Sequence, residues 1–142
     1  MSSSITTEVV EFILKGAPAP KDVKAKAVEH IIDGFAVMLA GSRMDCVEKL
    51  VNFLSECGRD DSSTIIGFDL KSCPFDAALV NGTSGHADDY DDTQLSTSPD
   101  RVYGLLTHPT VPALAASLAV GEKLGCSGSE FLEAFITGFE VE

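Results

Sequence analysis

Apolar residues recur with the period of an α-helix in several stretches of the chain. The clearest stretch lies between Pro20 and Gly41, where one face carries a continuous apolar stripe: Val28, Ile31, Ile32, Phe35, Ala36 and Leu39. Proline suits the first turn of a helix, and glycine suits the position just after its last turn. The spacing therefore predicts a helix over this range, with the stripe facing the core.

The same kind of spacing predicts further helices near residues 9–14, 47–54, 74–85 and 109–125, and from residue 127 onward. Gly82 and Gly85 are expected to loosen the helix that leads toward residue 86. Ser127 and Glu130 have the spacing of a capping box. The β-branched segment 62–68 (SSTIIGF) has no obvious partner strand and is interpreted as a connector, and residues 94–107 are interpreted as a loop. We therefore predict an all-α, bundle-like single domain over residues 1–142.

The composition of the chain argues against several classes of function. The net charge is -12 and only ten residues are Lys or Arg, which argues against binding to nucleic acid or to an anionic membrane. The longest apolar run, residues 35–40, is too short to span a bilayer. The first residues show no signal peptide, so a cytoplasmic location is expected. The four cysteines form no C-x-x-C pair and are interpreted as reduced packing residues.

The strongest candidate for chemistry is the segment HADDYDD, residues 86–92, with four aspartates and one histidine. Such a cluster can be a solvated turn, a cation site or a proton-transfer site. Asp88, Asp89 and Asp92 spell D-D-x-x-D, and on a helix this motif could bind Mg²⁺ as in isoprenoid synthases. The second acidic motif and the basic residues that a diphosphate substrate needs do not accompany it. The Mg²⁺ hypothesis therefore remains an alternative.

The acid/base interpretation adds His108, which stands at the junction between the 94–107 loop and the next helix. Histidine titrates near neutral pH, and carboxylates held close together have separated pKa values. A histidine and a carboxylate can remove a proton alpha to a carboxyl group and pass it to a leaving hydroxyl. This chemistry requires neither a metal nor a cofactor.

The chain resembles the MmgE/PrpD family, which includes 2-methylcitrate dehydratase and cis-aconitate decarboxylase. The resemblance rests on VNGTSGHADDYDDT (80–93), THPTVPALAASLAVGEKLGCSG (107–128), FLEAFITGFEVE (131–142) and KAVEHIIDGFAVMLAG (26–41). It implies an all-helical N-terminal portion of a larger lyase that acts without cofactor on a small polycarboxylic acid. A lid domain would complete the site, so this portion alone is expected to be inactive.

The resemblance also assigns roles to individual residues. Asp89 and His108 are expected to form the catalytic acid/base pair, with His86 and Asp92 on the substrate side.

Arg101 in the loop is a further candidate, as a substrate clamp. The chain ends with glutamates at the negative end of a helix dipole, which also suggests truncation. We further expect a homo-oligomer, and the alternative from another class is a non-catalytic helical domain that associates through exposed apolar faces.

Overall fold

The computed structural model describes residues 4–16, 18–55, 60–95 and 106–141. Helices dominate this part of the chain: α1 (Ile5–Lys15), α2 (Lys21–Gly41), α3 (Asp45–Ser55), α4 (Pro74–His86), α5 (Thr110–Leu124) and α6 (Gly128–Val141). Two short antiparallel ladders complete it: β1 (Ser63–Thr64) with β2 (Lys71–Ser72), and β3 (Gln94–Leu95) with β4 (Leu106–Thr107). The all-α prediction is confirmed. None of the helices described is long and apolar enough to cross a membrane.

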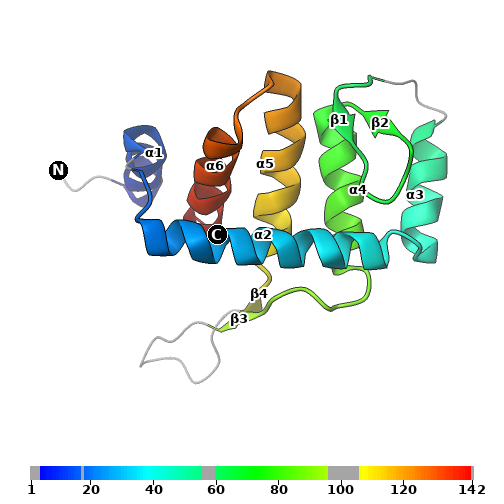
Figure 1. The fold of residues 1–142 in the computed structure, drawn as a ribbon, viewed down its shortest axis with the longest axis horizontal. Coiled ribbons are helices and arrows are strands. Elements are labelled where there is room, and N and C mark those ends of the chain that lie inside the picture. The colour runs from blue at the N-terminus through cyan, green and yellow to red at the C-terminus, as the bar shows by residue number, and fades with distance from the viewer. Residues whose placement is uncertain (1–3, 17, 56–59, 96–105, 142) are drawn as a thin grey trace.

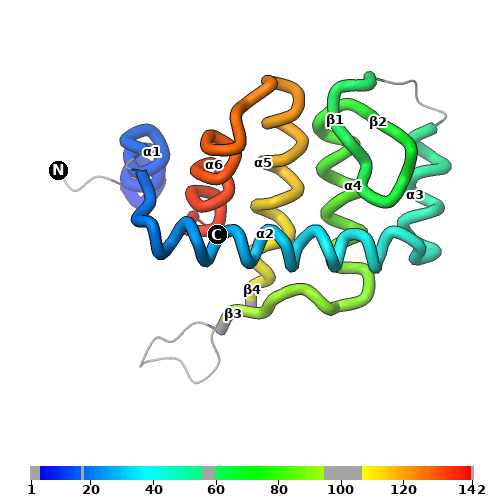
Figure 2. The backbone as a smooth tube through the Cα atoms, in the orientation of Figure 1, coloured from blue at the N-terminus to red at the C-terminus, as the bar shows by residue number. Residues whose placement is uncertain are grey.

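Helix α2 organises the fold. It runs crosswise along one end of a row formed by α6, α5 and α4, and it contacts all three (Figure 1). Within the row α4 packs against α5, and α5 packs against α6. The chain leaves α4 at the end near α2 and returns to α5 at the same end, as the tube in Figure 2 shows. The C-terminal end of α4 and the N-terminal end of α5 therefore lie on the same side of the domain.

The predicted helix ends are confirmed where the sequence carried a capping signal. Gly16 closes α1 with φ 42°, and Gly125 closes α5 with φ 64°, both in the left-handed region that glycine adopts easily. At the start of α6 the backbone N–H of Ser127 donates to Glu130 Oε2 over 2.7 Å, and the N–H of Glu130 donates to Ser127 Oγ over 3.3 Å. This is the reciprocal capping box that the spacing predicted.

The prediction of which α2 face is buried was wrong in part. Val28, Ile32 and Leu39 are 44%, 64% and 55% exposed. The buried face is shifted: it keeps Ile31 from the predicted stripe and adds Met38 and the small residues Ala27, Gly34 and Gly41. A glycine or alanine face lets neighbouring helices approach closely, and at Gly34 an added Cβ would lie 2.5 Å from a Leu114 methyl carbon. The apolar stripe was an incomplete guide, because the close contacts at Gly34 and Gly41 leave no room for a side chain.

The connector interpretation of residues 62–68 also needs correction, because Ser63 and Thr64 pair with Ser72 and Lys71. Asn81 of α4 holds this ladder in place. Its fully buried side chain donates to the carbonyl of Thr64 over 2.9 Å and accepts from the N–H of Ile66 over 2.8 Å. A short ladder can therefore persist because a helix side chain satisfies its backbone. Likewise, the ends of the predicted 94–107 loop form β3 and β4.

Gly82 and Gly85 do not loosen α4, which stays helical through His86. Gly85 instead provides space for α5, since a Cβ there would lie 2.6 Å from a Val111 methyl carbon. Gly41 has the same role between α2 and α4, where a Cβ would lie 1.9 Å from the carbonyl oxygen of Ser84. These two contacts fix the end of α4 between α2 and α5.

Replacing Gly41 with Ala should destabilise the fold by about 1–3 kcal/mol or more, because the clashing atom belongs to the backbone and cannot turn aside. Gly82→Ala is the matched control. Its Cβ would meet only the Ala115 Cβ at 3.9 Å, and the change should stabilise α4 by up to about 1 kcal/mol. Urea unfolding of both variants measures the difference. Equal stability of the two variants would contradict the close-approach account.

Candidate active site

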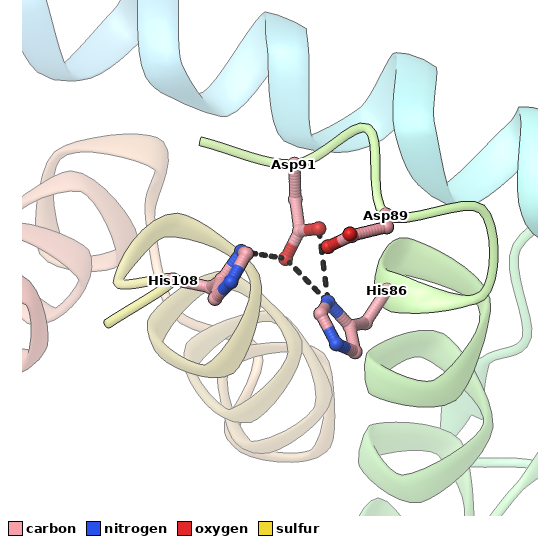
Figure 3. Close-up of side chains that lie close together, drawn as sticks. All are labelled: His86, Asp89, Asp91 and His108. Atoms are coloured by element: carbon pink, nitrogen blue, oxygen red, sulfur yellow. Dashed lines mark hydrogen bonds and ion pairs between the residues drawn. The ribbon is translucent and has the colours of Figure 1, made fainter. Parts of the chain in front are cut away.

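Four side chains gather where α4 ends and α5 begins. His86 is the last residue of α4, Asp89 and Asp91 lie in the loop that follows, and His108 stands two residues before α5. Figure 3 shows the two imidazoles on either side of the Asp91 carboxylate, with Asp89 directed toward the same point. One donor atom from each of the four lies within 4.8 Å of the others. The structure thus brings both predicted catalytic residues, Asp89 and His108, into one cluster.

Asp91 is the centre of this cluster. Its side chain is only 1% exposed. His86 Nδ1 lies 3.0 Å from Asp91 Oδ1 and 3.2 Å from Oδ2, and His108 Nδ1 lies 3.3 Å from Oδ2. The two imidazole rings also meet edge to face, with centroids 4.7 Å apart. A buried carboxylate is costly unless charged or hydrogen-bonding partners surround it, and the two histidines supply them.

The two imidazoles are not held equally. His86 forms the aligned contact with Asp91, although its own side chain is 56% exposed. The Nδ1 atom of His108 is buried and makes no aligned hydrogen bond despite its 3.3 Å distance from Asp91 Oδ2. A buried polar atom without an aligned partner is uncommon in native structures and calls for a functional explanation.

Asp89 reaches the cluster through an unusual backbone conformation. It has φ 56°, the one positive φ found outside glycine among the described residues. Aspartate tolerates this left-handed conformation better than most residues, but the conformation still has an energetic cost. Asp89 is exposed, whereas Asp91 is buried. The turn therefore presents one carboxylate to solvent and buries another two residues later.

Asp92 has different partners from its neighbours. Its carboxylate accepts from the backbone N–H of Thr110 over 3.2 Å and from the Thr110 hydroxyl over 2.8 Å. Thr110 is the first residue of α5, so Asp92 satisfies a free N–H at the positive end of that helix. His30 Nδ1 lies 3.7 Å from the same carboxylate, and the His30 ring packs against Phe139. The substrate-side role expected for Asp92 stays a prediction, whereas its capping contacts are structural.

The cluster opens onto a hollow of about 370 Å³ between α4 and α5. His86, Asp91 and His108 provide its polar wall, and small or apolar side chains form the rest: Ala78, Gly82, Val111, Pro112, Ala115 and Ala116. A concave, mainly apolar space with a few convergent titratable groups is the usual form of a small-molecule site. No lysine or arginine is among the described residues that line it.

The helical premise of the Mg²⁺ hypothesis is wrong. Helix α4 ends at His86, so Asp88 and Asp92 do not share a helix face. The cluster that does form, two histidines with Asp89 and Asp91, has donors better suited to a transition metal than to Mg²⁺. Ligands bound to zinc at ~2.1 Å lie roughly 3.4 Å apart, whereas these atoms spread over as much as 4.8 Å. As they stand, the four side chains are better placed to exchange protons than to enclose an ion.

The sequence analysis did not predict Asp91 as a site residue, and one of its candidates falls outside the part of the chain that the structure describes. Arg101, the candidate substrate clamp, lies outside the described residues. No signal in the sequence distinguished Asp91 from its neighbouring aspartates, because Asp89 and Tyr90 are both exposed and the burial of Asp91 depends on its contact with His108. His86, predicted from the resemblance, lies within the cluster.

The fold and site define an all-helical domain with two histidines and two aspartates clustered where α4 ends and α5 begins. Residues 8–142 match the family model described as the MmgE/PrpD N-terminal domain, and the chain belongs to this family. The family membership expected from the sequence motifs is thereby confirmed.

Three curated relatives are similar over most of the chain. The cis-aconitate decarboxylase-like protein oryM of Aspergillus oryzae is 29% identical over 97% of this chain and 29% of its own length. The cis-aconitate decarboxylase of Mus musculus is 31% identical over 79% of this chain and 22% of its own. That of Aspergillus terreus is 30% identical over 97% and 28%. The chain therefore spans less than a third of the length of these relatives.

The contact with Asp91 should be measurable in the titration of His86. The hydrogen bond from His86 to Asp91, and then the negative charge of Asp91, raise the pKa of His86 above 6.5, with a smaller contribution from Asp89. Asp91→Asn should lower this pKa toward 6.5, and Asp89→Asn should lower it less. NMR titration of the imidazole signals measures both shifts. An unchanged His86 pKa in Asp91→Asn would contradict the observed pairing.

The same contact makes stability depend on pH. Because the folded-state pKa of His86 is raised, its stabilisation is fully present below pH 6.5 and is lost as the pH rises through the raised value. Urea unfolding of the wild type should therefore show falling stability across this interval. In Asp91→Asn the slope should be smaller.

Asp92→Ala should destabilise the chain by about 0.5–2 kcal/mol, because α5 loses a cap at Thr110. Asp92→Asn keeps an acceptor oxygen and should lose less. Thermal unfolding of the two variants tests this order. If both variants unfold like the wild type, the Thr110 contacts do not stabilise α5.

Proposed function

We propose that this chain provides proton-transfer residues for a lyase that acts on a small polycarboxylic acid. The observation that carries the proposal is the His86, Asp89, Asp91 and His108 cluster at the edge of a hollow large enough for a small acid. Family membership supports the lyase class, and relatives named as cis-aconitate decarboxylases support an unsaturated tricarboxylic acid or a close analogue as substrate.

In this proposal Asp89 and His108 act as the acid/base pair without a cofactor. In a dehydration, the base removes the proton alpha to a carboxyl group, the electron pair of that bond forms the double bond, and the hydroxyl leaves as water with a proton from the acid. In a decarboxylation, the carbon–carbon bond to one carboxylate breaks and CO₂ departs. The electron pair left on the carbon framework then takes a proton from the acid. Neither route requires an oxidant or reductant.

The substrate's negative charges set a further requirement. The aspartates of residues 88–92 repel a polycarboxylate, and close pairs of like charge cost about 1 kcal/mol each even in water. His86, whose pKa is raised by its hydrogen bond to Asp91, can offset part of this repulsion when it is protonated. We propose that lysine or arginine side chains outside the described residues supply the rest. Activity therefore belongs to the whole protein that contains this chain.

A second candidate, self-association, is favoured by the exposed apolar side chains. Helix α1 has no buried residue, and on it Ile5, Phe12 and Leu14 are 81%, 52% and 79% exposed. The outer face of α2 adds Ile32 and Leu39. Apolar surface of this kind usually marks a contact with another chain or domain. We propose that it supports a homo-oligomer, which is compatible with catalysis and also with a purely structural role.

The decisive experiment uses the whole protein purified from its source. cis-Aconitate and 2-methylcitrate are supplied separately, CO₂ release is measured, and products are identified by NMR. His108→Ala and Asp89→Asn should each lower kcat at least about 100-fold, the usual contribution of a general acid or base.

Asp45→Asn is the matched control, because Asp45 is an exposed residue of α3 that pairs with Lys49 and lies outside the cluster. It should leave kcat within about threefold of the wild type. Little loss in His108→Ala would overturn the catalytic assignment. No turnover of any acid, combined with a stable oligomer in light scattering, would favour the structural role.

A further inference from the structure

We propose that Asp91 is the positioning residue of the site, holding the two imidazoles so that the remaining nitrogen of His108 is presented to substrate. This inference rests on the proposed function and extends it, because neither the motif resemblance nor the family match assigns Asp91 a role. Its basis is geometric: one buried carboxylate lies within 3.3 Å of the Nδ1 atoms of both His86 and His108.

Burial makes Asp91 suited to positioning and unsuited to touching substrate. Its side chain is 1% exposed, whereas those of His108 and His86 are 29% and 56% exposed. Although Asp91 is among the residues that line the hollow, its 1% exposure leaves little of its carboxylate for a bound molecule to reach. The partly exposed imidazoles can exchange protons with that molecule, and the carboxylate behind them can fix their orientation and their protonation pattern.

The tautomer of the neutral His108 ring is set by the nitrogen that faces the Asp91 carboxylate. An ionised carboxylate only accepts hydrogen bonds, so the nitrogen facing it is favoured to carry a proton. For His108 that nitrogen is Nδ1, and the neutral ring then leaves Nε2 with a free lone pair. A lone pair on the outward nitrogen is what a general base needs, as in serine hydrolases where a buried aspartate holds the base histidine.

The unaligned contact of His108 fits this role. Its buried Nδ1 lies 3.3 Å from Asp91 Oδ2 without an aligned hydrogen bond, while His86 is within 3.2 Å of both carboxylate oxygens. Of the two imidazoles, His86 therefore forms the better-aligned hydrogen bond with Asp91 in this structure. Catalytic hydrogen bonds are often poorly aligned without substrate and tighten when substrate binds. We infer that the site aligns by a small turn of the His108 ring toward Asp91.

The neighbouring aspartates do not offer the same function. Asp92 is engaged by Thr110 at the start of α5. Asp89 is exposed and held in the left-handed conformation. Asp88 does not belong to the cluster. Among the four aspartates of the loop, only Asp91 is both buried and within 3.3 Å of an imidazole nitrogen on each side.

The test in the whole protein compares Asp91→Asn with Asp88→Asn, which removes one charge from the same loop but leaves the cluster intact. Asp91→Asn should lower kcat at least about 100-fold and change KM less than about threefold, because it removes orientation and charge behind the base without touching substrate. The titration of His86 should also move to lower pH, because its hydrogen bond to Asp91 is weakened. Asp88→Asn should stay within about threefold of the wild type in kcat. Equal effects of the two variants would overturn the proposal.

A second readout is independent of activity. In the 142-residue chain, ¹⁵N chemical shifts of the imidazole nitrogens report which one carries the proton. Wild-type His108 should be protonated at Nδ1 when neutral, and Asp91→Asn should convert it to a mixture of the two tautomers. An unchanged tautomer in a folded Asp91→Asn chain overturns the proposal.

A third variant covers the case in which Asp91→Asn does not fold. His86→Ala removes a largely exposed ring and leaves Asp91 to His108 alone, so His108 should keep its proton on Nδ1. Loss of that tautomer in His86→Ala would overturn the proposal. If the whole protein converts no polycarboxylic acid, the proposed function fails, and the tautomer measurement still decides whether Asp91 positions His108.

Discussion

The close approach of helices at Gly41 and Gly85 determines the rest of the arrangement. At Gly41 helix α2 meets the carbonyl of Ser84, and at Gly85 helix α4 meets Val111 of α5, in both cases at distances that leave no room for a Cβ. Both contacts lie within the last turn of α4, immediately before His86. Because the end of α4 is fixed against two other helices, the loop after it starts from a defined position.

That loop separates charges that would otherwise repel one another. Asp91 is buried between two imidazoles, and Asp92 binds the free N–H at the start of α5. The positive φ of Asp89 turns the chain between α4 and these two anchors. Each anchored carboxylate therefore has its own partner, which is the pair of imidazole rings for Asp91 and the helix N-terminus for Asp92. Asp89, Asp91 and Asp92 look equivalent in the sequence, but each has different contacts and a different exposure in the structure.

The sequence was sufficient to predict the helices, and it was insufficient where small residues or identical side chains decide the structure. Pro20 and the capping box at Ser127 mark helix starts through local chemistry, so the starts of α2 and α6 could be predicted. The buried face of α2 could not, because Gly34 and Gly41 contribute little hydrophobicity and pack through shape. Asp91 could not be distinguished from its neighbouring aspartates, since its burial depends on where His108 arrives from the other side of the loop.

The placement of the histidines suggests how the site reconciles two opposing demands. A polycarboxylate must be attracted to a loop rich in aspartate, and a proton must be moved once the substrate is there. The two imidazoles divide these demands. His86, whose pKa is raised by its hydrogen bond to Asp91, can carry the positive charge that attracts a carboxylate. His108, with Nδ1 facing the same buried carboxylate, keeps a lone pair on Nε2 and can remove the proton. On the proposed function, the remaining cations need only orient the substrate, so an apolar hollow with few polar groups can serve as the acid/base half of a site.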